Sequence, residues 1–299
     1  MNIGFIGLGK MGLPMAMRLI GAGHRLTGSV RTRRPEHDEL AAAGGTTAGS
    51  PAEVAGGSQC VVLMLPGPGE IGEVMNGEHG LVAGLEPETL VLDCSTSLPS
   101  LTRENLRRVS DRGAKYVDAP VIGGPSVARD GGLQFLVGAE AVDYAAALPI
   151  LSLLGKEIIH VGGPGDGHAA KLVANLIALT NMAVLGEGLA LAGALGLDAE
   201  KMHQALTKGF PSSYVSQRHM GNIIQGRFTP SFALALGLKD LSLARDLAQQ
   251  AGYPLFLGSV ARELYQAGTV FGLSELNYTA VVQVFEKFGK PLRAPGVRE

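Results

Sequence analysis

The stretch IGFIGLGKMG, residues 3–12, decides the fold of this chain. Its first four residues predict a buried strand, and residues 15–19 (MAMRL) predict a helix beyond it. Gly7 permits a tight turn, Gly9 lets the backbone approach a pyrophosphate, and Gly12 lets helix and strand pack closely. A strand, a glycine-rich turn and a helix in this order are typical of a dinucleotide-binding domain.

The start of the predicted helix is suited to phosphate, because it supplies free N–H groups and a partial positive charge. We therefore predict that the whole turn contacts the dinucleotide. The predicted cofactor-binding residues of this turn are Gly7, Leu8, Gly9, Lys10, Met11 and Gly12.

The second predicted strand ends without a carboxylate. NAD-binding domains usually place an acidic residue there, about 20 residues after the glycines, to accept hydrogen bonds from the ribose 2′-hydroxyl. Here Val30 is followed by Arg31, Thr32 and Arg33. Arg31, helped by Thr32 and Arg33, can hold a 2′-phosphate through charge-assisted hydrogen bonds, and the alternative is a solvated basic turn. The sequence therefore favours NADP, with NAD as the other possible cofactor.

Short β-branched runs alternate with helical stretches through the first half of the chain. This alternation predicts an α/β fold, in which a mostly parallel sheet of the Rossmann type has helices on both faces. The predicted strands are residues 3–6, 25–30, 60–65, 89–93, 115–118, 133–137 and 158–161.

The second half reads as helical. The segment GGPGDG at residues 162–167 ends the alternation, and a long apolar helix follows from Lys171. Further helices are predicted at residues 198–207, 232–250, 257–267 and 278–288. Because a chain of 299 residues is long for one core, we predict two domains joined by the long helix. They are an NADP-binding domain at residues 1–162 and an all-helical substrate and dimerisation domain at residues 163–290, followed by a tail at residues 291–299.

The composition limits the kinds of molecule that this protein is expected to bind. Lys and Arg number 25 against 27 Asp and Glu, and a net charge of -2 gives no electrostatic reason to bind nucleic acid or an anionic membrane. The two cysteines, Cys60 and Cys94, lie in apolar runs and are predicted to be buried thiols, and no Cys or His spacing suggests a metal. The N-terminus shows no signal-peptide pattern. We expect a cytoplasmic protein that acts on a small molecule.

The apolar run at residues 172–195 is long enough to span a bilayer. Asn175, Asn181 and Glu187 interrupt it, and such polar groups are costly in hydrocarbon. We therefore interpret the run as a helix buried between domains or subunits. So long an apolar surface is hard to bury in one small helical domain, which predicts a homo-oligomer, a dimer or a tetramer.

Four further segments combine with the glycine stretch. MLP at residues 64–66 and DCST at 93–96 each end a predicted strand, DAPVIGG at 118–124 follows a third, and GHAAKLVAN at 167–175 opens the long helix. Together with residues 232–241, these motifs resemble the β-hydroxyacid dehydrogenase family over residues 1 to about 288. That family includes 3-hydroxyisobutyrate dehydrogenase, tartronate semialdehyde reductase and the glyoxylate/succinic semialdehyde reductases.

The resemblance implies an NAD(P)-dependent oxidoreductase that interconverts a small β-hydroxyacid and its semialdehyde, with its active site between a Rossmann-type and a helical domain. Lys171 is the predicted general acid and base. Reducing an aldehyde requires a group that protonates its oxygen, and a lysine partly withdrawn from water gives up its proton more readily. Asn175 lies four residues further on and shares a helix face with Lys171. The resemblance gives Asn175 the role of orienting the substrate oxygen.

Further site residues follow from the resemblance. By resemblance, Met64, Leu65, Pro66, Thr96 and Lys239 contact the cofactor, and Ser95 and Ile122 contact the substrate. Ordinary core is the alternative for Met64 and Leu65, and a solvated helical pair is the alternative for Lys239 and Asp240. His168 is interpreted as a helix-start residue or as a group that supports the site from behind.

The segment around Ile122 sets the expected substrate. Backbone N–H groups near Gly123 and Gly124 can hold the carboxylate of a small hydroxyacid, because glycines leave room for an anion. The family usually has serine at position 122, so Ile122 removes a hydroxyl and adds apolar bulk. The segment resembles tartronate semialdehyde reductase more than 3-hydroxyisobutyrate dehydrogenase, apart from Ile122.

Three other functions are considered. In the related 6-phosphogluconate dehydrogenase a histidine precedes the asparagine, whereas this chain has Ala174 there, and its helical domain is too short. Imine reductases share the architecture but commonly replace the lysine that is retained here as Lys171. A non-catalytic NADP-binding interaction module is the alternative from another class, and relatives with that role tend to have lost the lysine.

Overall fold

The computed structural model describes residues 1–29 and 35–297. The residues predicted to select NADP, Arg31 and Thr32, lie outside these ranges. The chain divides into two compact units, Met1–Lys171 and Leu172–Glu299.

The first unit is an α/β domain, as predicted from the alternation of short apolar runs. Each predicted strand is present, and two short strands, β3 and β7, are additional. Its elements are β1 (Asn2–Ile6), α1 (Gly12–Gly21), β2 (Arg25–Ser29), α2 (Pro35–Ala42), β3 (Thr46–Ala48), α3 (Pro51–Ala55), β4 (Cys60–Leu63), α4 (Pro68–Met75), α5 (Leu81–Gly84), β5 (Leu90–Asp93), α6 (Pro99–Ser110), β6 (Lys115–Asp118), β7 (Val121–Ile122), α7 (Pro125–Arg129), β8 (Leu133–Gly138), α8 (Ala141–Leu154) and β9 (Gly155–Gly162).

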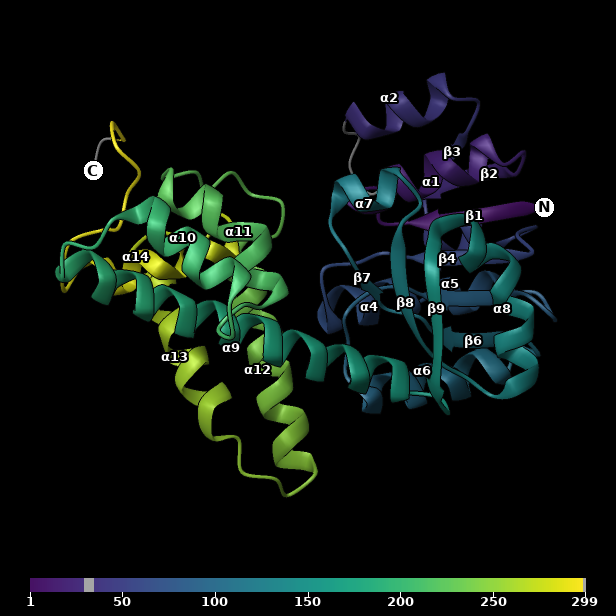
Figure 1. Cartoon of the computed structure of the whole chain (residues 1–299). Helices are drawn as coiled ribbons and strands as arrows, with labels where there is room; N and C mark the ends of the chain where they lie inside the picture. The colour runs from purple at the N-terminus through teal and green to yellow at the C-terminus, as the bar shows by residue number, and fades with distance from the viewer. Residues whose placement is uncertain (30–34, 298–299) are drawn as a thin grey trace. The chain divides into compact units, whose positions relative to one another are not determined.

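Within the described residues the strands form one nine-stranded sheet in the order β3-β2-β1-β4-β5-β6-β8-β7, with β9 paired to β8 (Figure 1). The strands from β3 to β6 are parallel, β8 runs antiparallel to β6 and β7, and β9 is parallel to β8. The chain leaves β1 toward β2 on one side and returns to β4 on the other. The carboxyl ends of β1 and β4 therefore flank the point where the strand order reverses, which is where open parallel sheets bind ligands.

Alternate residues of the central strands face two separate hydrophobic layers. In β4, Cys60 and Val62 belong to a core that includes residues of α1 and α8, whereas Val61 and Leu63 belong to a core that includes residues of α3 and α4. Both faces of β4 are fully buried, which explains why this strand reads as a continuous apolar run rather than an alternating one.

The two cysteines are free and buried, as predicted. Burial raises the pKa of the Cys60 thiol to about 12. Burial, helped by the nearby charge of Asp93, raises the pKa of Cys94 well above its ordinary value.

The long apolar helix is α9 (Asp166–Ala194), whose first turn belongs to the first unit and whose remainder belongs to the second. The second unit is helical and has its own core around Met182, Tyr265 and Val282. Its other elements are α10 (Ala199–Lys208), α11 (Tyr214–Ile224), α12 (Leu234–Gln250), α13 (Phe256–Val270), the 3₁₀ helix η1 (Tyr278–Val281) and α14 (Val282–Glu286).

By length and composition alone, α9 could cross a membrane. Only 39% of its most apolar 18-residue window is buried inside the chain. Large apolar side chains are exposed at helical spacing along α9, namely Val173, Ile177, Val184 and Leu191, and Leu195 directly after the helix is exposed as well.

Candidate active site

The predicted cofactor residues of the glycine turn and of the loops after β4 and β5 lie where adjacent parallel strands end, whereas Lys239 lies on α12 in the second unit. Gly7 follows β1, Met64 follows β4, and Ser95 and Thr96 follow β5. Since β1, β4 and β5 are neighbours in register, their carboxyl ends meet at one edge of the sheet. The loops after β1 and β4 are also in direct contact, because a Cβ on Gly7 would lie 2.2 Å from the carbonyl oxygen of Met64.

The glycine turn has three different environments. Gly7 has φ +100°, a conformation that L side chains rarely adopt. A Cβ on Gly12 would lie 1.9 Å from the Gly7 carbonyl oxygen and 2.9 Å from Cε1 of Phe5, so only glycine allows α1 to start this close to β1. A Cβ on Gly9 would meet nothing within 4 Å. The turn is therefore rigid at both ends and open at Gly9, a shape that fits a bound pyrophosphate.

Leu65 and Ser95 join the ends of β4 and β5. The Leu65 backbone N–H donates to Oγ of Ser95 at 3.0 Å, and the Ser95 N–H donates to Oδ1 of Asp93 at 3.0 Å. Ser95 is buried, whereas Met64, Leu65 and Thr96 are partly exposed. The Ser95 hydroxyl is therefore engaged with the strand-end loop that carries the predicted cofactor residues.

The predicted carboxylate-binding segment follows β7. Ile122 is partly buried and pairs with Gln134 of β8. Gly123 has φ +135°, and a Cβ there would lie 2.9 Å from Cδ2 of Leu133 and 3.1 Å from Cγ1 of Val127. A glycine is therefore required at position 123, and its backbone is exposed.

Lys171 lies on α9, six residues into the helix, and is 9% exposed. Asn175, one turn further along, donates through Nδ2 to Oδ2 of Asp240 at 2.6 Å. Nζ of Lys239 lies 3.0 Å from Oδ1 of the same carboxylate. Asp240 is 2% exposed, so its carboxyl group is buried, and Lys239 and Asp240 are not a solvated pair. The Asp240 carboxylate therefore contacts two predicted site residues, Asn175 through a hydrogen bond and Lys239 through an ion pair.

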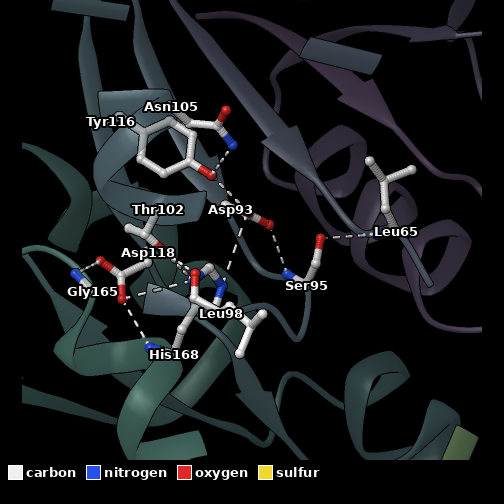
Figure 2. A network of polar contacts seen from close by, with 10 residues as sticks. All are labelled: Leu65, Asp93, Ser95, Leu98, Thr102, Asn105, Tyr116, Asp118, Gly165 and His168. Atoms are coloured by element: carbon white, nitrogen blue, oxygen red, sulfur yellow. Dashed lines mark hydrogen bonds and ion pairs between the residues drawn. The ribbon is translucent and has the colours of Figure 1, made fainter. Parts of the chain in front are cut away.

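A second cluster of buried polar side chains contacts the first turn of α9, as Figure 2 shows. Oδ1 of Asp118 accepts from the Gly165 N–H at 2.8 Å, and Oδ2 accepts from the His168 N–H at 2.9 Å. Nδ1 of His168 lies 2.6 Å from Oγ1 of Thr102. Burial raises the pKa of Asp118, and the interactions with His168 and with the Gly165 N–H partly oppose that shift.

Asp93 completes this group. Its Oδ2 accepts from the Tyr116 hydroxyl at 2.6 Å and lies 3.9 Å from Nε2 of His168. Burial first, and then the Asp93 charge, raise the pKa of Tyr116 well above its ordinary value, so Tyr116 remains a hydrogen-bond donor. Asp93, Asp118 and His168 are each 0% exposed.

Sequence reasoning singled out neither Asp93, Asp118 nor Asp240 as a site residue. A signal for the first two was available, since each is a carboxylate that ends an apolar strand expected to be buried on both faces. A charge in that position requires dedicated partners. For Asp240 the helical spacing gave no comparable signal.

Comparisons with known proteins agree with this arrangement. A family model described as the NAD binding domain of 6-phosphogluconate dehydrogenase matches residues 2–162. A second, described as NAD-binding of NADP-dependent 3-hydroxyisobutyrate dehydrogenase, matches residues 165–285. The two matches lie one after the other and cover most of the chain.

The chain is 37% identical to 2-hydroxy-3-oxopropionate reductase of Escherichia coli (strain K12), over 96% of this chain and 97% of the relative. It is similar to the solved structure of Mycobacterium tuberculosis 3-hydroxyisobutyrate dehydrogenase with L-serine, at a TM-score of 0.84 and 30% identity, over 94% of this chain and 98% of the other. An imine reductase of Streptomyces aurantiacus shares the fold at a TM-score of 0.61 and 20% identity, over 95% of this chain and 99% of the other.

The parallel sheet, the glycine turn at its switch point and these matches define an NAD(P)-dependent oxidoreductase. The chain belongs to the β-hydroxyacid dehydrogenase family. The resemblance seen in its motifs is thereby confirmed.

Proposed function

We propose that this protein interconverts a small β-hydroxyacid and its semialdehyde with NADP(H), and that Lys171 is its general acid and base. The observation that carries the proposal is the position of Lys171, which is 9% exposed on α9. A lysine withdrawn this far from water, with an amide one turn further on the same helix, is suited to exchanging a proton with a substrate oxygen.

In this reaction the cofactor and the side chains of α9 would have separate roles. When bound, the nicotinamide supplies the hydride that reduces the carbonyl carbon. Nζ of Lys171 donates a proton to the carbonyl oxygen during reduction and takes it back during oxidation. Because Nδ2 of Asn175 donates to Asp240 at 2.6 Å, its Oδ1 is the amide atom able to accept a hydrogen bond from the substrate hydroxyl. Asp240 thereby fixes the orientation of the amide.

The cofactor would lie along the carboxyl ends of β1, β4 and β5. We propose Gly7, Gly9 and Gly12 for the pyrophosphate, and the open space at Gly9 supports this assignment. The remaining proposed contacts are Leu8, Lys10, Met11, Arg31, Thr32, Met64, Leu65, Pro66, Thr96 and Lys239.

The substrate would bind beside Lys171. We propose the backbone N–H groups at Ile122, Gly123 and Gly124 for its carboxylate, with Ser95 nearby. The substrate class we favour is a semialdehyde acid such as tartronate semialdehyde, because the relative at 37% identity is a 2-hydroxy-3-oxopropionate reductase.

A preference for NADP over NAD is part of the proposal. It rests on the basic residues after β2 in the sequence and on the description of the second family model as NADP-dependent. Arg31→Asp removes the proposed phosphate partner and adds repulsion, so it is expected to weaken NADPH binding about tenfold more than NADH binding. Equal losses for the two cofactors, measured by fluorescence titration, would remove the reason for preferring NADP.

The proposed domains are residues 1–162 for the cofactor and residues 163–290 for substrate and dimerisation, with a tail at residues 291–299. We propose that α9 is an interface between copies of the chain in a cytoplasmic homo-oligomer, and not a membrane span. Support comes from the exposed apolar row of α9, in which Val184 is 63% and Leu191 is 61% exposed.

The oligomer is tested by light scattering after chromatography. Changing both Val184 and Leu191 to Lys is expected to reduce the mass to that of one chain, because two charges at a packed interface leave unpaired ions. Val142→Lys is the matched control, since Val142 is 68% exposed on α8. A single-chain mass for the unmodified protein would contradict this part of the proposal.

The activity is tested by NADPH oxidation with glyoxylate, succinic semialdehyde, tartronate semialdehyde and methylmalonate semialdehyde. The protein is expected to turn over at least one of them, and Lys171→Ala is expected to lower kcat at least about a hundredfold. Lys156→Ala, an exposed lysine on β9, is the matched control. If neither the protein nor its variants oxidise NADPH with any of the four, the proposed substrate class is wrong.

A further inference from the structure

His168 is more than the start of a helix. Its imidazole is completely buried between two carboxylates, with Nε2 at 3.9 Å from Oδ2 of Asp93 and Nδ1 at 3.9 Å from Oδ2 of Asp118 (Figure 2). Two buried anions are costly unless they are hydrogen-bonded and face positive charge or N–H donors. The histidine ring lies within 3.9 Å of both carboxylates.

The ring atoms have different surroundings. Nδ1 lies 2.6 Å from Oγ1 of Thr102, a hydroxyl that also lies 3.3 Å from the Leu98 carbonyl oxygen. Nε2 is buried without a hydrogen-bond partner within 3.5 Å among the described residues, and the acceptor that it faces is the Asp93 carboxylate. A lone pair on Nε2 would point toward an anion, whereas a proton there is attracted to it. The surroundings therefore favour a proton on Nε2.

The same residue fixes the first turn of α9. The N–H groups of Gly165 and His168 both donate to Asp118, which satisfies donors that a helix start leaves unpaired. The turn packs closely on the sheet, because a Cβ on Gly167 would lie 2.5 Å from the Leu136 carbonyl oxygen and 2.7 Å from that of Asp118. Lys171 follows His168 by three residues, so the two side chains project from neighbouring places on one helix face.

The other side of the group reaches the cofactor residues. Asp93 accepts from the Ser95 N–H, and Oγ of Ser95 accepts from the Leu65 N–H. A series of polar contacts therefore runs from the loop after β4, through Ser95 and Asp93, to His168 in the first turn of α9.

We propose that His168, with its proton on Nε2, is a positioning residue that couples Asp93 to the first turn of α9 and so sets the position of Lys171. This inference rests on the proposed role of Lys171 as general acid and base. His168 touches no reacting atom in this scheme, and it acts through the carboxylates and the helix turn.

Two amide variants separate the ring nitrogens. In His168→Gln the side-chain amide reaches the place of Nε2, whereas in His168→Asn it reaches only the place of Nδ1. We expect the Gln variant to keep at least about a third of the kcat and the Asn variant to lose at least about tenfold, with the KM for the aldehyde within about threefold in both. His79→Asn, an exposed histidine, is the control. Equal kcat values for the two His168 variants would overturn the proposal.

Two measurements without substrate complete the test. Nitrogen-15 NMR of the unchanged, histidine-labelled protein at about pH 7, with His168 identified by sequential resonance assignment, should show a proton on Nε2. Amide hydrogen exchange at residues 167–171 should be about tenfold faster in the Asn variant than in the Gln variant. An unprotonated Nε2 would refute the proposal even if both variants failed to fold. An active Lys171→Ala with a protonated Nε2 would instead show that the proposed catalytic role, and not the helix-turn geometry, is wrong.

Discussion

Changing either of two glycines of the same turn to alanine should impair different properties. Gly12→Ala should lower thermal stability, whereas Gly9→Ala should weaken cofactor binding. At Gly12 a Cβ would lie 1.9 Å from a backbone carbonyl oxygen, so α1 or the loop after β1 must move. Overpacking of this kind costs about 1–3 kcal/mol. At about 2–4 °C for each kcal/mol in a unit of this size, Gly12→Ala is expected to lower the melting temperature by about 2–12 °C.

At Gly9 a Cβ meets nothing within 4 Å, so Gly9→Ala is expected to change stability by no more than about 0.5 kcal/mol. The same methyl would stand in the space proposed for the pyrophosphate. A loss of about 1.4–2.8 kcal/mol of binding free energy corresponds to about a 10- to 100-fold weaker Kd for NADPH.

The assay is a pair of measurements on each variant, a thermal melt without cofactor and a titration of NADPH fluorescence. The reasoning is refuted if Gly9→Ala melts as low as Gly12→Ala, or if it binds NADPH within about twofold of the unchanged protein. The first result would mean that the turn is not open at Gly9, and the second that the phosphates do not approach there.

Three further predictions concern the site. Asp240→Asn keeps the size of the side chain but removes the charge beside Lys239, and we expect kcat to fall about tenfold. The control is Asp246→Asn, at a side chain that is 41% exposed, which should change kcat less than about twofold. Ile122→Ser adds a hydroxyl beside the proposed carboxylate site and should raise kcat/KM for tartronate semialdehyde at least about threefold, so a decrease would argue against that site. Burial raises the pKa of Asp118 above its ordinary 3.8, so the native state holds that proton more tightly than the unfolded state. The stability of the unchanged protein relative to Asp118→Asn should therefore fall as the pH rises above that value, and urea unfolding between about pH 4 and 7 that shows a constant difference would contradict it.

Much of the fold could be predicted because the strands and the glycine turn of the first unit have recognisable patterns within short stretches of sequence. Strands buried on both faces, such as β4, are continuous apolar runs, and Gly7 and Gly12 mark a turn whose geometry tolerates no other residue. The short strand β3 escaped prediction because its residues, Thr46–Ala48, are polar or small and mostly exposed. The helix α11 was not predicted, although Val215, Met220 and Ile223 lie on one buried face. Its Gly221 and its β-branched residues lower the helix propensity of the segment.

The sequence predicts site residues only where the residues lie within one segment of the chain. Lys171 and Asn175 share a helix, so their spacing places them on one face. Asp93, Asp118 and His168 are separated by 25 or more residues along the chain and meet only because β5 pairs with β6 and α9 starts beside them. Asp240 joins Asn175 across 65 positions of sequence. Contacts of this kind depend on strand order and helix packing, which a single sequence does not spell out.

The two buried cysteines give this protein a built-in reporter of local opening. Cys60 lies in β4 and Cys94 directly follows β5, and their raised pKa values keep them as unreactive thiols in the closed sheet. A thiol reagent should therefore label the native chain only as fast as the centre of the sheet opens. A cysteine introduced on the surface would be labelled first and alone, so fluorescent probes can be attached there without first removing Cys60 or Cys94.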